Sequence, residues 1–210
     1  MSNVWFTSDL HIGHELVAVQ RFQPSQIDGP AAIAWHDATL ARVWDGSVGK
    51  DDQVWVLGDL SAGGPEATAY ALNWIADRPG TKHLVPGNHC PVHPMYRDAH
   101  RWQSAYQQVF ASVQPFARRK IAGRSVLLSH FPYAGGGDHT TEERYTQYRL
   151  QDEGLVLLHG HTHRAEKVSW VGPAGFPLAS TLQIHVGVDA WEMRPVHLDE
   201  VAVLIEESHR

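Results

Sequence analysis

The sequence predicts an α/β domain built around a largely parallel β-sheet. Short runs rich in Val and Leu recur along the chain, and each is bounded by Gly, Pro, Asp or Ser, which favours buried strands over helices. Stretches with helix-like spacing of apolar residues lie between several of these runs, and strands that alternate with helices are typical of α/β folds. No repeat, low-complexity tract or linker divides the chain, so we expect one domain over residues 1–210.

Strands and helices are expected to alternate through the first three quarters of the chain. The five expected strands, each followed at once by polar residues, are 4–6, 54–57, 83–85, 125–128 and 155–158. Two helices are expected, over residues 31–44, which carry one apolar face, and over residues 65–75, which open with Pro and Glu and close before a Pro-Gly pair.

The pattern changes after Ala165 to strands with little helix. The strands expected in this tail are 167–171, 181–186 and 196–198. A last helix is expected over residues 199–207, beginning at an Asp cap. We interpret the tail as a second sheet that packs on the first.

Composition limits the classes of function. With 43% hydrophobic residues the chain can bury a substantial core, and nothing in it is typical of a disordered or fibrous protein. A net charge of −6 and a pI near 6.2 disfavour stable binding of nucleic acid, although two bound cations would still make a site locally positive. The lone Cys90 excludes an intrachain disulfide, and neither a signal peptide nor a membrane-spanning apolar run is visible. We therefore expect a cytoplasmic protein with no membrane partner.

Side chains that can bind metals follow all five of the early strands. They are Asp9, His11, Asp59, Asn88, His89, His130, His161 and His163. Ligands bind beyond the carboxyl ends of strands in open α/β sheets, so these loops are expected to converge on one crevice. Residues two apart at the end of a strand can point to the same side, which would pair Asp9 with His11 and His161 with His163.

The mixture of carboxylate, amide and imidazole donors favours a transition metal. Such a set suits Mn, Fe, Zn, Co or Ni better than Ca. A carboxylate such as Asp59 can bridge two ions, and hydrolytic two-metal sites hold their ions about 3.5–4 Å apart. Gly58, Gly87 and Gly160 beside the ligands would let the backbone approach the metals closely. Any one of these histidines alone would be explained as well by a strand cap or a polar core contact.

Together these clusters resemble the signature motifs of the calcineurin-like metallophosphoesterase superfamily. The motifs, in the superfamily's order, are Asp9-x-His11, Gly58-Asp59, Gly87-Asn88-His89, His130 and Gly160-His161-x-His163. The short chain and the stretch Val186-Gly-Val-Asp-Ala-Trp191 resemble small bacterial and phage members. The resemblance implies a four-layer sandwich, in which two facing mixed β-sheets are flanked by helices.

The resemblance also assigns roles and a cofactor of two divalent ions, for which Mn²⁺ is favoured and Fe, Zn, Co or Ni are alternatives. One ion would be bound by Asp9, His11 and His163, and the other by Asn88, His130 and His161, with Asp59 bridging both. Asn88 would also neutralise charge on the phosphoryl oxygens, and His89 would protonate the leaving group.

One position departs from the superfamily's pattern. The third motif usually continues with Asp or Glu, which is thought to orient the histidine, and here the next residue is Cys90. The departure puts the strength of His89 as an acid in doubt, though not the metal site. A nucleophilic or metal-binding role for Cys90 is the alternative to a packed neutral thiol.

Four further residues are candidates for substrate binding. His14 lies three residues after His11 and could contact phosphate, and the Gly-rich segment 131–154 carries His139, Arg144 and Arg149. If this segment is a mobile substrate loop, one of its arginines would clamp the phosphate; the alternative is an irregular surface connection. We interpret the other histidines as packed or surface residues, namely His36, His83, His93, His100, His159, His185, His197 and His209.

The expected activity is hydrolysis of phosphate esters by metal-activated water. A domain without an evident cap leaves the site open, which favours small diesters such as 2′,3′-cyclic nucleotides over monoesters or a nuclease substrate. A non-catalytic scaffold is an alternative from another class, but such family members tend to lose ligand residues and this chain has all seven. A single-zinc hydrolase is a further alternative, which the number of ions per chain would distinguish. The oligomeric state is not predicted.

Overall fold

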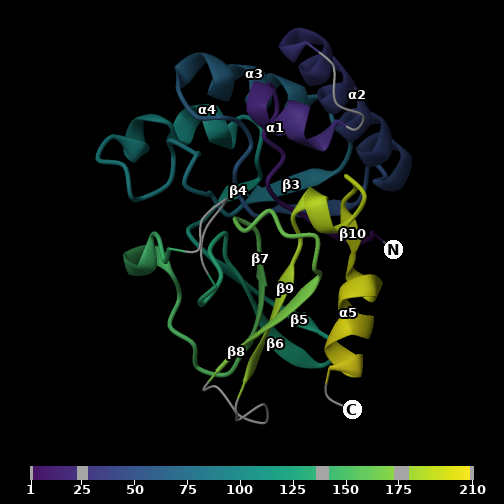
Figure 1. The fold of residues 1–210 in the computed structure, drawn as a ribbon, viewed down its shortest axis with the longest axis vertical. Coiled ribbons are helices and arrows are strands. Elements are labelled where there is room, and N and C mark those ends of the chain that lie inside the picture. Colours follow the sequence, from purple (N-terminus) through teal and green to yellow (C-terminus); the bar gives the residue numbers. More distant parts are fainter. Residues whose placement is uncertain (1, 23–27, 136–141, 173–179, 209–210) are drawn as a thin grey trace.

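Two five-stranded mixed sheets face each other in the computed structural model, which describes residues 2–22, 28–135, 142–172 and 180–208 (Figure 1). The first sheet, in spatial order, is β10 (Val196–His197), β1 (Val4–Thr7), β2 (Gln53–Val56), β3 (Thr81–Leu84) and β4 (Ser112–Val113). The second is β5 (Ala117–Ile121), β6 (Arg124–Leu128), β7 (Val156–His159), β9 (Thr181–His185) and β8 (Val168–Val171). Strands β1 to β4 are parallel and β10 is antiparallel to β1, whereas in the second sheet only β6, β7 and β9 are parallel.

Helices flank the sheets. They are α1 (Glu15–Arg21), α2 (Gly29–Ser47), α3 (Pro65–Ala76), α4 (Gln103–Gln107) and α5 (Leu198–Glu207). Figure 1 shows α1 to α4 gathered on the side of the first sheet that faces away from the second sheet, and α5 beside the second sheet. None of the helices in the described ranges has the length and apolar character needed to cross a bilayer.

Successive residues of the first sheet are buried on opposite faces. On β2, Val54 and Val56 belong to the apolar cluster that contains Trp44 of α2, whereas Trp55 belongs to the cluster that contains Val126 of the second sheet. Because both faces are covered, β1 and β2 read as nearly continuous apolar runs rather than alternating ones. This burial explains why the runs were recognisable in the sequence as buried strands.

The predicted fold of two facing mixed sheets flanked by helices is confirmed, and every predicted strand and helix is present with shifted ends. The prediction that the tail alone forms the second sheet is wrong. Strands β5, β6 and β7 precede the tail and belong to the second sheet, and β10 of the tail joins the first sheet beside β1. A buried apolar run has the same pattern in either sheet, so local sequence could not assign the sheets.

The cap of the last helix also differs from the prediction. Helix α5 begins at Leu198, and its N-cap is His197, whose Nδ1 accepts the backbone N–H of Asp199 (3.2 Å). Glu200 accepts the backbone N–H of His197 (3.1 Å), which completes a capping box. A ring nitrogen therefore supplies the acceptor that was expected from Asp199. The sequence also failed to predict the short elements α1, α4, β4 and β5.

Candidate metal centre

The loops that follow β1, β2, β3, β6 and β7 meet where the carboxyl ends of the two sheets adjoin. In the first sheet, the backbone N–H of Asp9 donates to the carbonyl of Gly58 (3.2 Å), and in the second that of Gly160 donates to the carbonyl of His130 (3.0 Å). The N–H of His161 crosses between the sheets and donates to the carboxylate of Asp9 (3.0 and 3.1 Å). The loops thus converge as predicted, but two sheets supply them instead of one.

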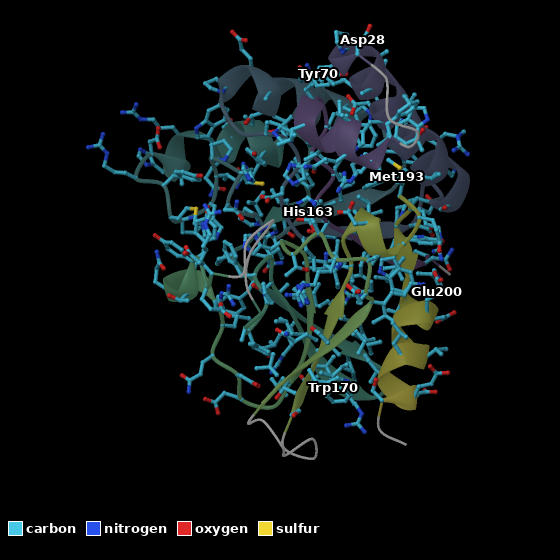
Figure 2. All side chains as sticks on the ribbon, viewed as in Figure 1. Asp28, Tyr70, His163, Trp170, Met193 and Glu200 are labelled. Atoms are coloured by element: carbon cyan, nitrogen blue, oxygen red, sulfur yellow. The ribbon has the colours of Figure 1, made fainter. Side chains whose placement is uncertain are left out.

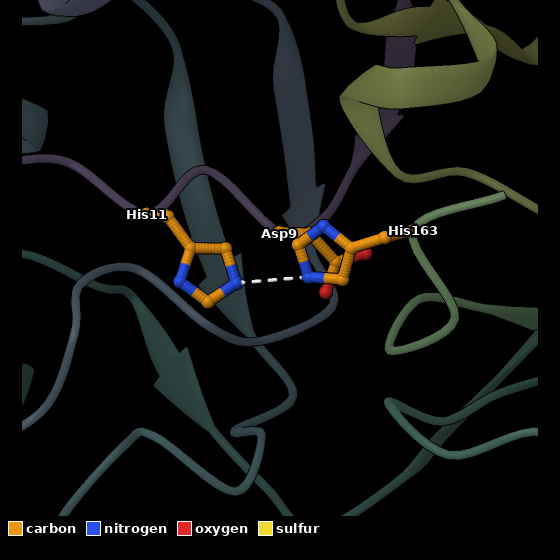
Figure 3. A group of neighbouring side chains, drawn as sticks. All are labelled: Asp9, His11 and His163. Atoms are coloured by element: carbon orange, nitrogen blue, oxygen red, sulfur yellow. Dashed lines mark hydrogen bonds between the residues drawn. The ribbon is translucent and has the colours of Figure 1, made fainter. Parts of the chain in front are cut away.

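The first group of candidate ligands consists of Asp9, His11 and His163, whose ligand atoms all lie within 4.8 Å of one another (Figure 3). The Nε2 atoms of His11 and His163 are 3.1 Å apart. Donors that bind one ion at about 2.0–2.2 Å are separated by about 3.0–3.5 Å, so this distance fits a shared ion. Burial would raise the pKa of Asp9, but a hydrogen bond from His185 and the nearby His163 outweigh it and hold the pKa well below its ordinary value.

The second group consists of Asp59, His130 and His161, again with ligand atoms within 4.8 Å of one another. The Nε2 atom of His130 lies 3.0 Å from Oδ1 of Asn88 and 3.3 Å from Oδ2 of Asp59. The carbonyl of Leu57 can only accept, so Nδ1 of His130, 2.7 Å away, donates to it. This contact turns Nε2 toward the two oxygens, as a metal ligand requires.

Buried nitrogen atoms without a protein partner also fit a metal centre. Neither ring nitrogen of His161 makes a hydrogen bond within the described part of the chain, although the residue is only 1% exposed. An unsatisfied buried polar atom is costly, and coordination to an ion would satisfy it. Burial would lower the pKa of His130, but the carboxylate of Asp59 outweighs burial and raises it to about 9. The groups around Nε2 of His130 therefore favour a positive charge there, as they would favour a cation.

Five of the candidate ligands have left-handed backbone conformations. Their φ angles are 58° at Asp9, 48° at His11, 50° at Asp59, 72° at His161 and 49° at His163. Strand β1 ends before Asp9 and His11, and strand β7 ends before His161 and His163. The expectation that strand geometry aligns the two side chains of each pair is therefore wrong. Left-handed turns direct the side chains instead, at a cost of about 1–2 kcal/mol per residue, and such strain is typical of functional sites.

Glycines beside the ligands allow the loops to pack closely. A Cβ atom on Gly160 would overlap the hydroxyl of Ser8 and lie 2.7 Å from Oδ2 of Asp9. A Cβ on Gly58 would lie 2.5 Å from Nδ1 of His130. The close approach predicted for these glycines is therefore an approach to the ligand side chains themselves.

His89 is oriented without the carboxylate that its motif usually supplies. Its Nδ1 lies 3.2 Å from the carbonyl oxygen of Ala62, which can only accept, so Nδ1 carries a proton. Its backbone N–H donates to Oδ1 of Asp59 (2.9 Å). Cys90 is only 1% exposed among apolar side chains, and burial raises the pKa of its thiol to about 12. A neutral thiol in this environment favours packing over nucleophilic or ligand chemistry.

Two of the predicted substrate contacts are histidines. The ring of His14 lies beside that of His11, with centroids 5.5 Å apart. Burial, and then the neighbouring His89, lower the pKa of His14. The structure thus brings His14 next to the first ligand group. His139 lies outside the described residues.

The two predicted phosphate-clamping arginines contact their own loop. Arg149 is largely buried, with Nη1 2.6 Å from Oε2 of Glu143, and its Nε donates to the carbonyl of Arg144 (3.2 Å). The guanidinium of Arg144 lies over the ring of Tyr145, 5.1 Å from its centroid. The ring of Tyr145 in turn lies 5.6 Å from that of His161. Tyr145 is therefore a site neighbour that sequence reasoning did not select as a candidate.

Sequence reasoning also missed residues behind the first ligand group. His185, interpreted as an ordinary packed residue, has its Nε2 3.6 Å from Oδ2 of Asp9. Asp189 has its Oδ2 3.1 Å from Nδ1 of His163. The one available signal was that Asp189 belongs to the Val186–Trp191 stretch noted above; no local signal identified His185.

Comparison with known proteins gives consistent results over almost the whole chain. The sequence model of the calcineurin-like phosphoesterase family matches residues 2–165. The chain is 48% identical to the gene 66 protein of Mycobacterium phage L5 over 216 residues, which cover 100% of this chain and 97% of the phage protein. It is 49% identical to the gene 66 protein of Mycobacterium phage D29 over 213 residues, covering 99% and 98%. A solved structure of a protein of unknown function from Aquifex aeolicus, 22% identical, shares the fold with a TM-score of 0.66 over 97% of this chain and 100% of that one.

Proposed function

Because this chain belongs to the calcineurin-like phosphoesterase family, we propose that it is a dinuclear metal-dependent phosphodiesterase that hydrolyses small diesters such as 2′,3′-cyclic nucleotides. The observation that carries the proposal is the pair of adjacent ligand groups. One contains Asp9, His11 and His163 and the other Asp59, His130 and His161, each with ligand atoms within 4.8 Å of one another.

Each ligand group would hold one divalent ion, and Asp59 is proposed to bridge them. Ions held in this way, Mn²⁺ in our proposal, would lower the pKa of bound water and would neutralise negative charge on the phosphoryl oxygens. Asn88 lies with the second group, since its Oδ1 is 3.0 Å from Nε2 of His130. It is proposed to bind the ion through Oδ1 and to donate from its amide nitrogen to the phosphate.

His89 is proposed to protonate the leaving oxygen. The carbonyl of Ala62 holds the proton of Nδ1, so Nε2 is the atom that carries and releases the transferred proton. The ring of His89 packs edge-on against that of His11, with centroids 5.4 Å apart, which places it beside the first ligand group. This arrangement supports an acid that acts next to the metal centre without binding an ion.

The charges near the site favour a diester over a monoester. A diester carries one negative charge, whereas a phosphate monoester carries nearly two at neutral pH. The guanidinium of Arg149 is paired with Glu143 at 2.6 Å, and that of Arg144 lies over the ring of Tyr145. Beyond the ions themselves, Arg149 therefore adds little net charge for a second phosphate oxyanion, because Glu143 balances its charge.

Initial rates with Mn²⁺ on bis(p-nitrophenyl) phosphate and on p-nitrophenyl phosphate test this proposal, with metal-stripped protein as the blank. We expect hydrolysis that depends on the metal and is faster on the diester. Faster hydrolysis of the monoester would contradict the diesterase assignment. No metal-dependent hydrolysis of either ester or of 2′,3′-cyclic nucleotides would contradict an enzymatic role and favour a scaffold. Metal analysis that finds two ions per chain would exclude a single-zinc hydrolase.

Replacing His89 with Ala is expected to slow the hydrolysis of esters, and the effect should be larger the poorer the leaving group. Removal of a general acid costs about 10²–10⁴-fold for a leaving group that needs protonation and much less for p-nitrophenolate. The measurement compares kcat on p-nitrophenyl and alkyl esters of the same phosphate, with metal content determined alongside. Metal content should equal that of the wild type. Equal slowing on both esters would show that His89 is not the acid.

A further inference from the structure

A network of charged side chains contacts the first ligand group. Nδ1 of His163 lies 3.1 Å from Oδ2 of Asp189. Arg21 holds the same carboxylate with two hydrogen bonds, from Nε to Oδ1 (2.8 Å) and from Nη2 to Oδ2 (2.7 Å). Its Nη2 also donates to the backbone carbonyl of Asp9 (2.8 Å), and its Nη1 to that of Leu10 (3.3 Å). One guanidinium therefore fixes the carboxylate beside one candidate ligand and the backbone of another.

The network also reaches the loop that carries His11. Nη1 of Arg21 lies 3.0 Å from Nε2 of His36 in α2, and Nδ1 of His36 lies 2.9 Å from Oδ1 of Asp37. The carboxylate of Asp37 accepts the backbone N–H of Gly13 at 3.2 Å, two residues beyond His11. All three members of the first ligand group are thus tied to the same buried network.

The burial and the geometry of the Arg21–Asp189 pair distinguish this network from a chance surface contact. The side chains of Arg21 and Asp189 are only 7% and 18% exposed, and their bidentate contact fixes both planar groups. Neither residue belongs to the five motifs, and Asp189 lies beyond the residues 2–165 that the family model matches. The pair is bidentate and largely buried, and the remaining donors of Arg21 contact the backbone of Asp9 and Leu10 and the ring of His36. It therefore differs from a solvent-exposed ion pair, which contributes little.

We propose that Arg21 and Asp189 are positioning residues that set the affinity of the first ligand group for its divalent ion. A carboxylate that accepts from Nδ1 fixes the tautomer of an imidazole, so that Nε2 carries no proton and becomes a stronger ligand. In His163 this unprotonated nitrogen is Nε2, which faces Nε2 of His11 at 3.1 Å (Figure 3). This inference rests on the proposed dinuclear site and extends it, because it assigns control of one ion to residues outside the motifs.

The test measures metal binding directly. Metal-stripped full-length wild type, Asp189→Asn, Asp189→Ala and Arg21→Lys are titrated with Mn²⁺ alone, and affinity and stoichiometry are read by calorimetry and metal analysis. One of the two ions should bind about 10–100-fold more weakly in the variants, and the other as in the wild type. The loss should be larger for Asp189→Ala than for Asp189→Asn, because an amide oxygen can still accept from His163. Saturating Mn²⁺ should restore most of kcat on the diester.

A matched ion pair serves as the control. Arg194 also binds a carboxylate with two hydrogen bonds, to Glu200 of α5 (2.8 and 2.7 Å). Glu200 lies well away from His163 in Figure 2. Glu200→Gln and Arg194→Lys should therefore leave both Mn²⁺ affinities unchanged, whatever they do to the melting temperature.

The outcomes separate this inference from the proposed function. If the wild type binds two ions and the variants bind both with unchanged affinity, Arg21 and Asp189 are not positioning residues. The same conclusion follows if the control pair weakens Mn²⁺ binding as much as they do. If the wild type binds no Mn²⁺, the dinuclear function fails and this inference fails with it. Arg21→Lys keeps the positive charge and removes only the planar guanidinium that makes two hydrogen bonds to Asp189. It therefore tests the role of this geometry even if Asp189→Ala does not fold.

Discussion

Asp59→Asn is expected to abolish hydrolysis and to weaken metal loading. The side chain is 2% exposed, and its Oδ2 lies 3.3 Å from Nε2 of His130. Exchange of a carboxylate for an amide keeps the shape and removes the negative charge that would hold two cations together. We expect kcat on the diester to fall by on the order of 10³-fold or more, which corresponds to the loss of several kcal/mol of charge stabilisation. Initial rates and metal content per chain provide the measurement.

Asp52→Asn is the matched control for this change. Asp52 is a comparably buried carboxylate, 5% exposed, at the opposite end of β2. It accepts hydrogen bonds from the backbone of Asn3 (2.7 Å) and Gly49 (2.9 Å) and from the ring of Trp5 (3.0 Å). This variant should fold less stably than the wild type, but its metal content and its rate of diester hydrolysis should equal those of the wild type. Near wild-type rates in Asp59→Asn, or equal losses in both variants, would contradict the bridging role.

Gly87→Ala is expected to lower both stability and kcat, although it adds a single methyl group. A Cβ at this position would overlap Oδ1 of Asp59 and lie 2.7 Å from Cε1 and Nδ1 of His130. Both are held by other contacts, so neither can move without disturbing the second ligand group. We expect a loss of stability of about 1–3 kcal/mol from overpacking and a fall in kcat of about 10²-fold from a displacement of order 1 Å. Urea unfolding and initial rates measure the two effects.

Gly46→Ala makes the same chemical change without the crowding. Gly46 lies in the last turn of α2, and a Cβ built there has no heavy atom within 4 Å. Alanine is the better helix former by about 0.5–1 kcal/mol, so stability should stay level or rise while kcat is unchanged. Wild-type rate and metal content in Gly87→Ala would show that the loops are less tightly packed than the structure indicates.

Much of the candidate site could be predicted because its signals are local. Each ligand follows directly on a buried apolar run, so the runs located the strands and the residues after them located the site. The grouping of ligands came only with the superfamily resemblance. The structure brings Asp9, His11 and His163 together as one group and Asp59, His130 and His161 as another, with Asn88 beside His130. The way the chain directs them could not be predicted, because left-handed conformations at Asp9 and His163 replace the strand pleat that the spacing suggested.

The sequence by itself therefore determined most of the strands, the principal helices, the family and the candidate donors of a metal centre. Hydrophobic periodicity and side-chain chemistry are properties of neighbouring residues, and they survive without knowledge of the fold. Only the tertiary structure decided which sheet each strand joins and which residues stand behind the ligands. Arg21 and Asp189 are 168 positions apart, and their contact exists because α1 lies against the 3₁₀ helix Val188–Ala190 that follows β9. No local sequence pattern predicts this contact, because it depends on how the two sheets and their helices are arranged in space.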